Sequence, residues 1–304
     1  MTTALANILG IAALLAWSMS VGLTRHLAEA HRFGLPGLSF FTAGILMISF
    51  DFARGKKPPW RTGANPLFWL LAGGAFVGYI VFYDTALSWS ASRDVVLTLG
   101  LVNYFWPALI LLIMPVFFVC RVNWAILGAG LLLCLSGVGM ALLRDVSIAD
   151  VMRNMADDWP AFLIMTGAAF LWAFYSNAAR KWAGRASGAG WFMLTSGLVL
   201  LVMWRLDGGP LGFEPGMTLP FLVHALVVNA AAYALWELGV RRGDLRFLGL
   251  AANFLPLASV IVGSWYLGGG FSSRLWLGGG MVALGAYLCG KGLGNDSPQA
   301  EQGT

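Results

Sequence analysis

The second half of this chain repeats the first, and each copy is built from apolar segments of membrane length. Several polar, aromatic and glycine residues recur 150 positions later; the pairs are Tyr83 and Tyr233, Asp94 and Asp244, Asn103 and Asn253, Gly128 and Gly278, and Gly130 and Gly280. Trp17 and Arg25 recur 155 positions later as Trp172 and Arg180. Charged residues make up only 11% of the chain, whereas a soluble domain carries about 25%. The chain is therefore expected to fold in lipid as an all-α integral membrane protein.

The apolar segments predict ten transmembrane helices, five in each copy. Their expected ranges are 4–24, 35–53, 66–90, 94–119, 124–143, 160–183, 187–205, 218–240, 245–268 and 274–293. Residues 1–143 and 160–293 are the two repeats, 144–159 form a polar connector, and 294–304 form a polar tail expected to be disordered. Because five spans are an odd number, the second repeat is inverted relative to the first. Inverted repeats enclose a midplane substrate site in secondary transporters, so we expect a central cavity.

The basic residues set the expected orientation. With the N-terminus in the cytoplasm, twelve of the 19 Lys and Arg residues fall in inner loops and seven in outer loops. Positive charge is typically kept inside, so both termini are expected in the cytoplasm and the connector outside. The basic residues are scattered rather than gathered in a patch, which argues against a nucleic-acid partner.

Polar and aromatic side chains in the middle of apolar helices are the candidates for a binding site. The set expected to line the cavity is Trp17, Tyr79, Tyr83, Asn103, Trp106, Trp172, Tyr175, Asn229, Tyr233 and Asn253. Aromatic rings pack against planar or apolar ligand groups and attract ammonium groups, and amides hydrogen-bond a carboxylate or an amine without a fixed buried charge. The alternative is that the rings are packing or interface residues and the amides tie helices together.

Two prolines and one carboxylate inside the predicted spans also call for an explanation. Pro107 and Pro256 lie mid-helix at nearly matching places in the two repeats, and each frees a carbonyl four residues back. They are expected to act as hinges or to expose a carbonyl to substrate. Asp84 has Ala234 as its repeat counterpart. An acid within the membrane suggests a proton or cation site, and the alternative is a hydrated carboxylate at the cavity mouth.

The remaining polar residues favour structural roles. Glu237 precedes Arg241 by four residues, which predicts a salt bridge, and Asp94 and Asp244 stand where helix caps are expected. His224 is isolated in its helix and is expected to be packed or hydrogen-bonded. No paired acid and base, metal-ligand spacing or Walker-type run is present. The sequence therefore predicts neither an enzyme nor a cofactor, a metal or direct use of ATP.

The ten-helix, two-repeat pattern resembles the drug/metabolite transporter superfamily of the EamA type over essentially the whole chain. The resemblance is carried by Ala16–Ser18 followed by Arg25, by Asn103–Pro107 and by Asn253–Leu257. The Asn-Tyr-Phe-Trp-Pro run at 103–107 looks like the YddG-type aromatic amino-acid exporters in particular. Family members often keep a glutamate after the fourth and ninth helices, where this chain has Cys120-Arg121 and Gly268–Gly270.

This resemblance implies a multi-pass protein of the bacterial inner membrane that exports aromatic amino acids by alternating access, as a monomer or a homodimer. The residues by themselves are also compatible with two other functions. One is an exporter of other small metabolites or cationic drugs on the same fold. Another is a membrane protein with a structural or assembly role and no transport activity.

Overall fold

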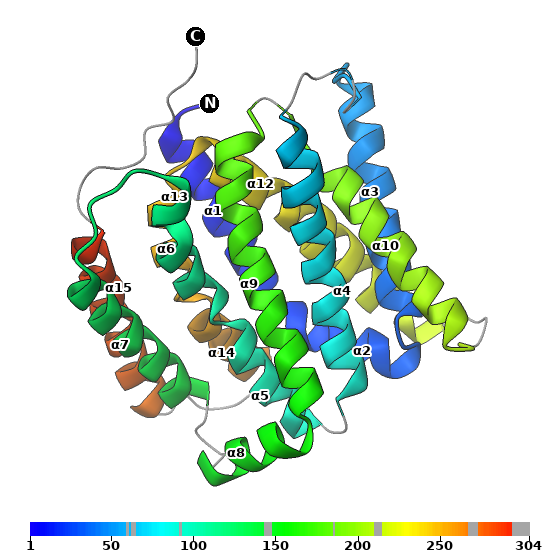
Figure 1. The fold of residues 1–304 in the computed structure, drawn as a ribbon. Helices are drawn as coiled ribbons and strands as arrows, with labels where there is room; N and C mark the ends of the chain where they lie inside the picture. Colours follow the sequence, from blue (N-terminus) through cyan, green and yellow to red (C-terminus); the bar gives the residue numbers. More distant parts are fainter. Residues whose placement is uncertain are drawn as a thin grey trace.

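The computed structural model describes residues 1–58, 61, 65–90, 93–142, 148–184, 186–209, 215–266 and 273–293. Within these ranges the chain is helical and contains no strand (Figure 1). The elements are α1 (Thr3–Trp17), α2 (Ser20–Ala30), α3 (Gly34–Ala53), η2 (Phe68–Ala72), α4 (Gly73–Trp89), α5 (Arg93–Asn103), α6 (Trp106–Phe117), α7 (Trp124–Leu142), α8 (Ile148–Asp157), α9 (Trp159–Trp182), α10 (Ala189–Leu206), η3 (Pro215–Met217), α11 (Thr218–Leu222), η4 (Val223–Ala231), α12 (Ala232–Arg242), α13 (Leu245–Ala252), α14 (Leu255–Tyr266) and α15 (Ser273–Gly292). The predicted all-α fold is confirmed, and the predicted tail 294–304 lies outside the described residues.

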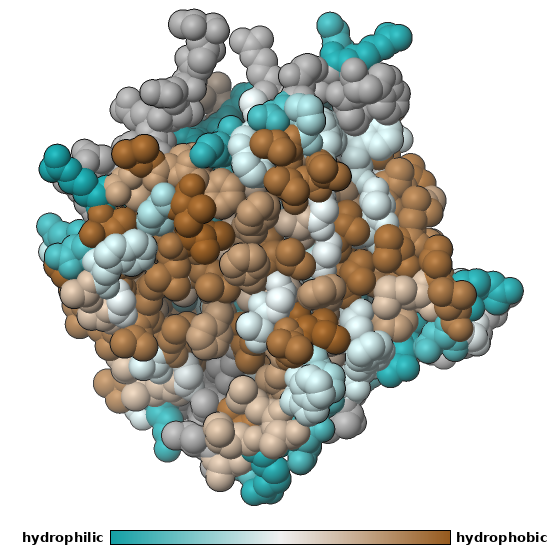
Figure 2. Space-filling model, viewed as in Figure 1, coloured by the Kyte–Doolittle hydropathy of each residue, from teal (hydrophilic) through white to brown (hydrophobic). Residues whose placement is uncertain are grey.

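Helices fall in all ten predicted ranges, but they differ in length and continuity. Five stretches of the described chain are long and apolar enough to cross a membrane, namely 34–53, 68–89, 159–182, 189–206 and 218–242. α1 and α2 would form a sixth span with a 42° bend. Apolar side chains cover the middle of the visible face, and hydrophilic ones gather at its margins (Figure 2). This distribution suits a protein surrounded by lipid.

Three predicted helices are broken, two of them next to a proline. The range 94–119 divides into α5 and α6 at Tyr104 and Phe105, and 245–268 divides into α13 and α14 at Asn253 and Phe254. Pro107 and Pro256 occupy the second position of the helices that follow, where a missing N–H is tolerated. The chain therefore interrupts each helix before the proline instead of bending through it.

The connector contains a helix that is not among the ten predicted from the sequence. Residues 148–157 form α8, which lies across one end of the bundle beside the start of α9 (Figure 1). Val151, Met152 and Met155 recur at helical spacing among polar residues, so the segment is amphipathic. The connector also contains four aspartates, and its polar composition therefore favoured a loop over a helix.

Each helix pair with extensive contacts joins one helix from the first sequence copy to one helix from the second. α3 packs on α10 and α7 on α15, and each pair joins helices with the same place in the two copies. α1 packs on α12 and α4 on α9, which pairs the first helix of one copy with the third helix of the other. Glycines allow close approach: a Cβ on Gly130 of α7 would lie 2.7 Å from the backbone nitrogen of Cys289 in α15. The α7–α15 pair stands at one edge of the bundle, and the other helices surround its centre (Figure 1).

Candidate functional site

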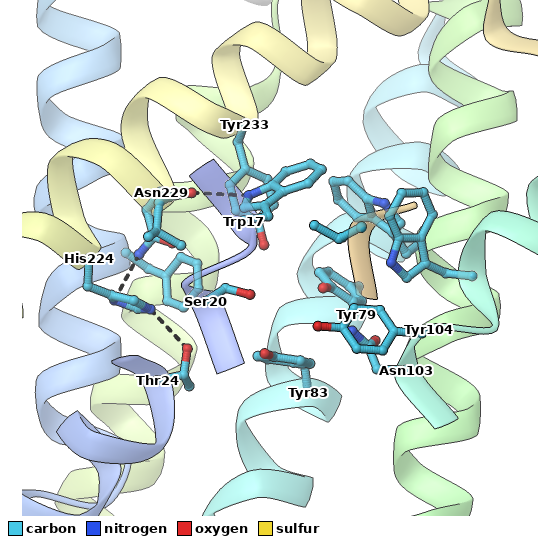
Figure 3. Close-up of a pocket in the computed structure, with 15 residues that line it drawn as sticks. Trp17, Ser20, Thr24, Tyr79, Tyr83, Asn103, Tyr104, His224, Asn229 and Tyr233 are labelled. Carbon is cyan, nitrogen blue, oxygen red and sulfur yellow. Dashed lines mark hydrogen bonds between the residues drawn. The ribbon is translucent and has the colours of Figure 1, made fainter. Parts of the chain in front are cut away.

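A small cavity lies at the centre of the bundle and is lined from both copies (Figure 3). Its wall consists of Trp17, Ser20, Thr24, Phe40, Tyr79, Tyr83, Asn103, Tyr104, Trp106, Trp172, His224, Val228, Asn229, Tyr233 and Leu255. All of these side chains except Ser20 are buried. The free space is about 20 Å³, and a water molecule needs about 10–15 Å³. The cavity as it stands is therefore nearly closed.

Eight of the ten predicted lining residues lie on this wall, and Tyr175 and Asn253 do not. The ring of Tyr175 packs behind the wall, 5.1 Å from Trp172 and 5.0 Å from Phe76 between ring centroids. Asn253 stands at the break between α13 and α14, and its Nδ2 donates to the carbonyls of Gly249 and Leu250. Its role is to close a helix end. Asn103 lines the cavity, so Asn253 and its repeat partner differ in position.

Aromatic rings form a continuous cluster on one part of the wall. Trp17 meets Trp172 and Tyr233 edge-on at 5.4 and 4.9 Å between centroids, and Tyr79 lies 4.7 Å from Trp172. The Nε1 of Trp17 donates to the carbonyl of Val228 at 3.1 Å. Each aromatic pair contributes about 0.5–1.5 kcal/mol beyond area burial. The cluster therefore offers a stable apolar surface to a planar ligand group.

A polar group occupies the opposite part of the wall. His224 has Thr24 Oγ1 at 3.0 Å from its Nε2 and Ser39 Oγ at 2.7 Å from its Nδ1. The Nδ2 of Asn229 donates to Ser39 Oγ at 2.9 Å. The expectation that His224 is a hydrogen-bonded residue is confirmed, but its place on the cavity wall was not predicted.

The local helix geometry explains why His224 was missed. His224 and Asn229 are five residues apart, which puts them on different faces of an α-helix. Both lie in η4, a π-helical segment, and in a π-helix residues five apart are brought together by the hydrogen-bonding pattern. Thr24, in contrast, follows Trp17 by seven residues, and in the single helix predicted over 4–24 that spacing places both residues on one face.

Asp84 lies away from the cavity wall, one residue after Tyr83 on α4. Its side chain is fully buried, and both carboxylate oxygens lack a hydrogen-bond partner among the described residues. The proton or cation site and the alternative of a hydrated carboxylate both stay predictions.

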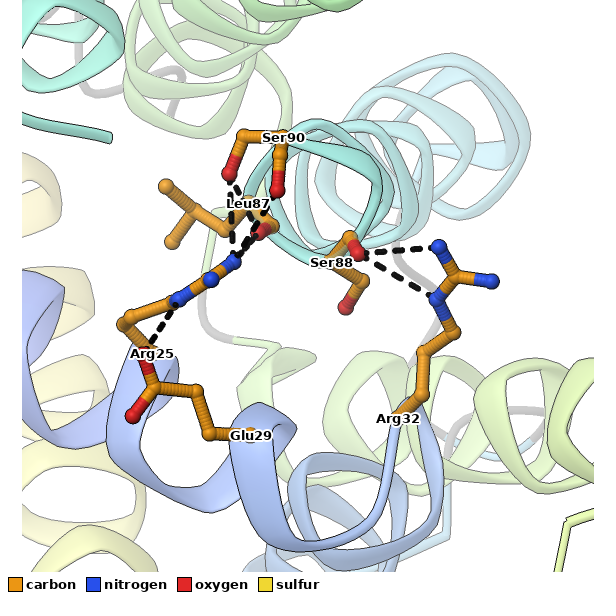
Figure 4. Close-up of polar contacts among 6 residues, drawn as sticks. All are labelled: Arg25, Glu29, Arg32, Leu87, Ser88 and Ser90. Atoms are coloured by element: carbon orange, nitrogen blue, oxygen red, sulfur yellow. Dashed lines mark hydrogen bonds and ion pairs between the residues drawn. The ribbon is translucent and has the colours of Figure 1, made fainter. Parts of the chain in front are cut away.

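Arginine contacts close the two ends of the bundle. At one end, Arg25 Nη1 donates to the carbonyl of Leu87 at 2.7 Å and to Ser90 Oγ at 3.1 Å, and Arg32 donates to the carbonyl of Ser88 (Figure 4). These contacts join α2 and the residues that follow it to the C-terminal end of α4. The Nε of Arg25 also pairs with Glu29 at 3.0 Å.

The opposite end has an equivalent contact from the repeat partner of Arg25. Arg180 Nη1 donates to the carbonyl of Arg241 at 2.8 Å and to that of Val240 at 3.5 Å, which joins α9 to the C-terminal end of α12. Ser90 and Val240 are themselves 150 positions apart, and Arg25 Nη1 also lies 3.5 Å from the carbonyl of Ser90. We call these contacts the Arg25 latch and the Arg180 latch.

The predicted structural acids are partly confirmed. Glu237 pairs with Arg241 at 3.9 Å, and its carboxylate also accepts from Ser187 Oγ and from the backbone nitrogens of Gly188 and Ala189. It thus caps the start of α10 from another helix. Asp244 caps α13 by accepting from two backbone N–H groups, whereas the side chain of Asp94 lies outside the described residues.

Comparison with known proteins finds similarity to membrane transporters in both the family model and the curated relatives. The EamA-like transporter family model matches residues 159–290. Over 298 residues the chain is 29% identical to the aromatic amino acid exporter YddG of Salmonella typhimurium, covering 95% of this chain and 98% of that one. It is 29% identical to YddG of Escherichia coli over 294 residues, with the same coverage, and 27% identical to YddG of Ancylobacter novellus over 271 residues. A solved crystal structure superposes with a TM-score of 0.74 at 25% identity, covering 93% of this chain and 96% of the other.

Proposed function

We propose, from the match of residues 159–290 to the EamA-like transporter family model, that the chain is a secondary transporter that exports aromatic amino acids across the bacterial inner membrane. The observation that carries the proposal is a central cavity with an aromatic part and a polar part, lined from both copies. Relatives that align over nearly the whole chain are named aromatic amino acid exporters. A ring fits the aromatic cluster, and an amino and a carboxyl group fit the polar part.

The membrane arrangement belongs to the same proposal. It consists of ten spans in two inverted repeats, residues 1–143 and 160–293, with the connector 144–159 outside and both termini in the cytoplasm. The packing of α1 on α12 supports the repeat, because α9 packs on α4 in the corresponding way. The Arg25 and Arg180 latches support the inversion, because equivalent contacts lie at opposite ends of the bundle.

Transport requires the closed cavity to open toward one face at a time. Ligand pockets usually have volumes of about 300–1,000 Å³, far more than the 20 Å³ found here. The breaks at Pro107 and Pro256 are natural hinges, because no continuous helix resists bending there. Substrate then favours whichever open form binds it better.

Uptake into proteoliposomes that contain only the purified chain tests this function. Labelled tryptophan should enter saturably, and phenylalanine should compete while quaternary organic cations, which have no N–H donor, should not. Trp172→Ala should reduce uptake strongly at unchanged protein levels, since it removes the ring that contacts both Trp17 and Tyr79. Trp124→Ala serves as the matched control, because Trp124 is exposed at the start of α7. Competition by organic cations alone would favour a cationic drug exporter, and no uptake of any solute would contradict a transport role.

A further inference from the structure

The orientation of one amide in the cavity wall is fixed by a chain of hydrogen bonds behind it. Asn229 Nδ2 can only donate, and it donates to Ser39 Oγ at 2.9 Å. The hydroxyl proton of Ser39 is then directed to Nδ1 of His224 at 2.7 Å. With Nδ1 as acceptor, the ring proton is on Nε2 and donates to Thr24 Oγ1 at 3.0 Å. All four side chains are buried, so water does not compete for these bonds.

This arrangement leaves the amide oxygen of Asn229 without a partner. Its Oδ1 is buried and has no hydrogen bond among the described residues, and the same holds for Oδ1 of Asn103. Asn103 and Asn229 lie on opposite sides of the space drawn in Figure 3, and the hydroxyl of Tyr83 on the same wall is also unpaired among the described residues. A buried carbonyl acceptor without a partner is unfavourable. Two such acceptors on the wall of one cavity indicate that a ligand supplies their hydrogen-bond donors.

We propose that the amide oxygens of Asn229 and Asn103 bind the ammonium group of the transported amino acid, and that the Ser39–His224–Thr24 chain holds Asn229 in the receptive orientation. This inference rests on the proposed function and specifies which part of the substrate meets which part of the wall. An ammonium group has three donors and no acceptor, which matches two amide oxygens. Asn229 and Asn103 contact the substrate, and His224 and Ser39 are positioning residues.

Electrostatics favours the same assignment. The wall, as the described residues form it, carries no Asp, Glu, Lys or Arg. Neutral oxygens can therefore hold an ammonium group without leaving an uncompensated negative charge when the substrate departs. Trp17 and Tyr79 lie on the same wall, and aromatic rings of this kind attract a cation further. A reversed hydrogen-bond chain would instead present the amide N–H₂ of Asn229 to the cavity and select the carboxylate.

Two substrate analogues separate these orientations. Tryptamine keeps the ammonium group and lacks the carboxylate, whereas indole-3-propionate keeps the carboxylate and lacks the ammonium group. The full chain in lipid nanodiscs would be loaded with labelled tryptophan and challenged with each analogue. Tryptamine should compete about tenfold or more better than indole-3-propionate, as expected for a charge-assisted hydrogen bond.

Variants of the chain then show which residues cause the preference for tryptamine over indole-3-propionate. Asn229→Leu should weaken tryptophan binding about 10- to 100-fold and leave competition by indole-3-propionate unchanged, so that discrimination disappears. His224→Leu should reduce discrimination, and His224→Gln should restore it, because its amide can accept from Ser39 and donate to Thr24. A purely structural role of His224 would weaken both analogues equally. Thr195→Val, an exposed control on α10 whose hydroxyl bonds its own helix, should change neither value.

The outcomes that overturn the inference are distinct from failure of the proposed function. Equal competition by the two analogues, or better competition by indole-3-propionate, overturns the ammonium assignment alone. Equal weakening of every ligand by Asn229→Leu does the same. If the wild-type chain does not bind tryptophan, the proposed function fails and the inference fails with it. Ser39→Ala, which removes a single hydroxyl, carries the test if Asn229→Leu does not fold.

Discussion

Replacing Arg25 by glutamine should open one end of the cavity, and replacing Arg180 should open the other. Arg25→Gln removes the donors to the carbonyl of Leu87 at 2.7 Å and to Ser90 Oγ at 3.1 Å, and Arg180→Gln removes the bond to the carbonyl of Arg241 at 2.8 Å. A hydrogen bond from a charged group contributes about 1.5–3 kcal/mol. The side chain of Arg25 is 19% exposed, so we use the lower value of about 1.5 kcal/mol for each latch. Since 1.4 kcal/mol is a factor of ten, each loss should raise the open population at that end roughly tenfold.

Thiol labelling from each side of the membrane measures this population. Ser20 lines the cavity, and Ser20→Cys would report on access when Cys120, the partly exposed native cysteine, is replaced by serine. A membrane-impermeant maleimide would be added to vesicles of each orientation. Arg25→Gln should raise the labelling rate about tenfold from the face of the Arg25 latch, and Arg180→Gln should do so from the opposite face.

Arg153→Gln alters an exposed arginine of α8 that pairs with Asp150, and it should leave both labelling rates unchanged. Faster labelling from the same face in both latch variants would refute the idea of opposed latches. Unchanged rates in both variants would show that other contacts hold the ends closed.

Other substitutions test the acids and the glycine packing. Asp84→Asn should abolish stimulation of tryptophan uptake by an imposed pH gradient and leave exchange of tryptophan for tryptophan intact, because an amide does not exchange a proton; persisting stimulation excludes Asp84 as the proton site. Glu237→Ala should lower the free energy of unfolding by about 3–5 kcal/mol in denaturant titrations, because it leaves the buried charge of Arg241 without its partner; a loss below about 1 kcal/mol would contradict this role. Gly130→Val should lower the thermal midpoint because its Cβ would lie 2.7 Å from a backbone nitrogen of α15, at a cost of about 1–3 kcal/mol. Gly128→Val, whose Cβ meets open space, is the matched control, and equal midpoints for the two variants would argue against tight α7–α15 packing.

Much of the cavity wall could be predicted from the sequence, because polar and aromatic residues recur at equivalent positions of the two copies. Tyr83 and Tyr233 recur at a fixed distance and both lie on the wall. The prolines indicated where helices would be interrupted, since a missing N–H is a local property that needs no knowledge of the fold. Composition indicated a lipid environment, and apolar segments of membrane length indicated helices.

The remainder depends on information that helical periodicity does not contain. The π-helical segment η4 aligns His224 with Asn229, and a search at α-helical spacing separates them. Asn253 has the same repeat position as Asn103, but it turns to the carbonyls of its own helix end. Repeat symmetry assigns both amides to one role, and only the three-dimensional packing distinguishes them.

The small volume of the cavity has a consequence for how affinity is measured. An amino acid does not fit into about 20 Å³, so every binding event includes the free energy needed to separate the helices. The apparent Kd then equals the intrinsic Kd divided by the fraction of molecules already separated. A substitution on a distant helix that weakens the closed packing should therefore tighten the measured affinity without touching the ligand. Inhibitor screens against this protein will rank compounds correctly only when the helix packing is the same in every sample.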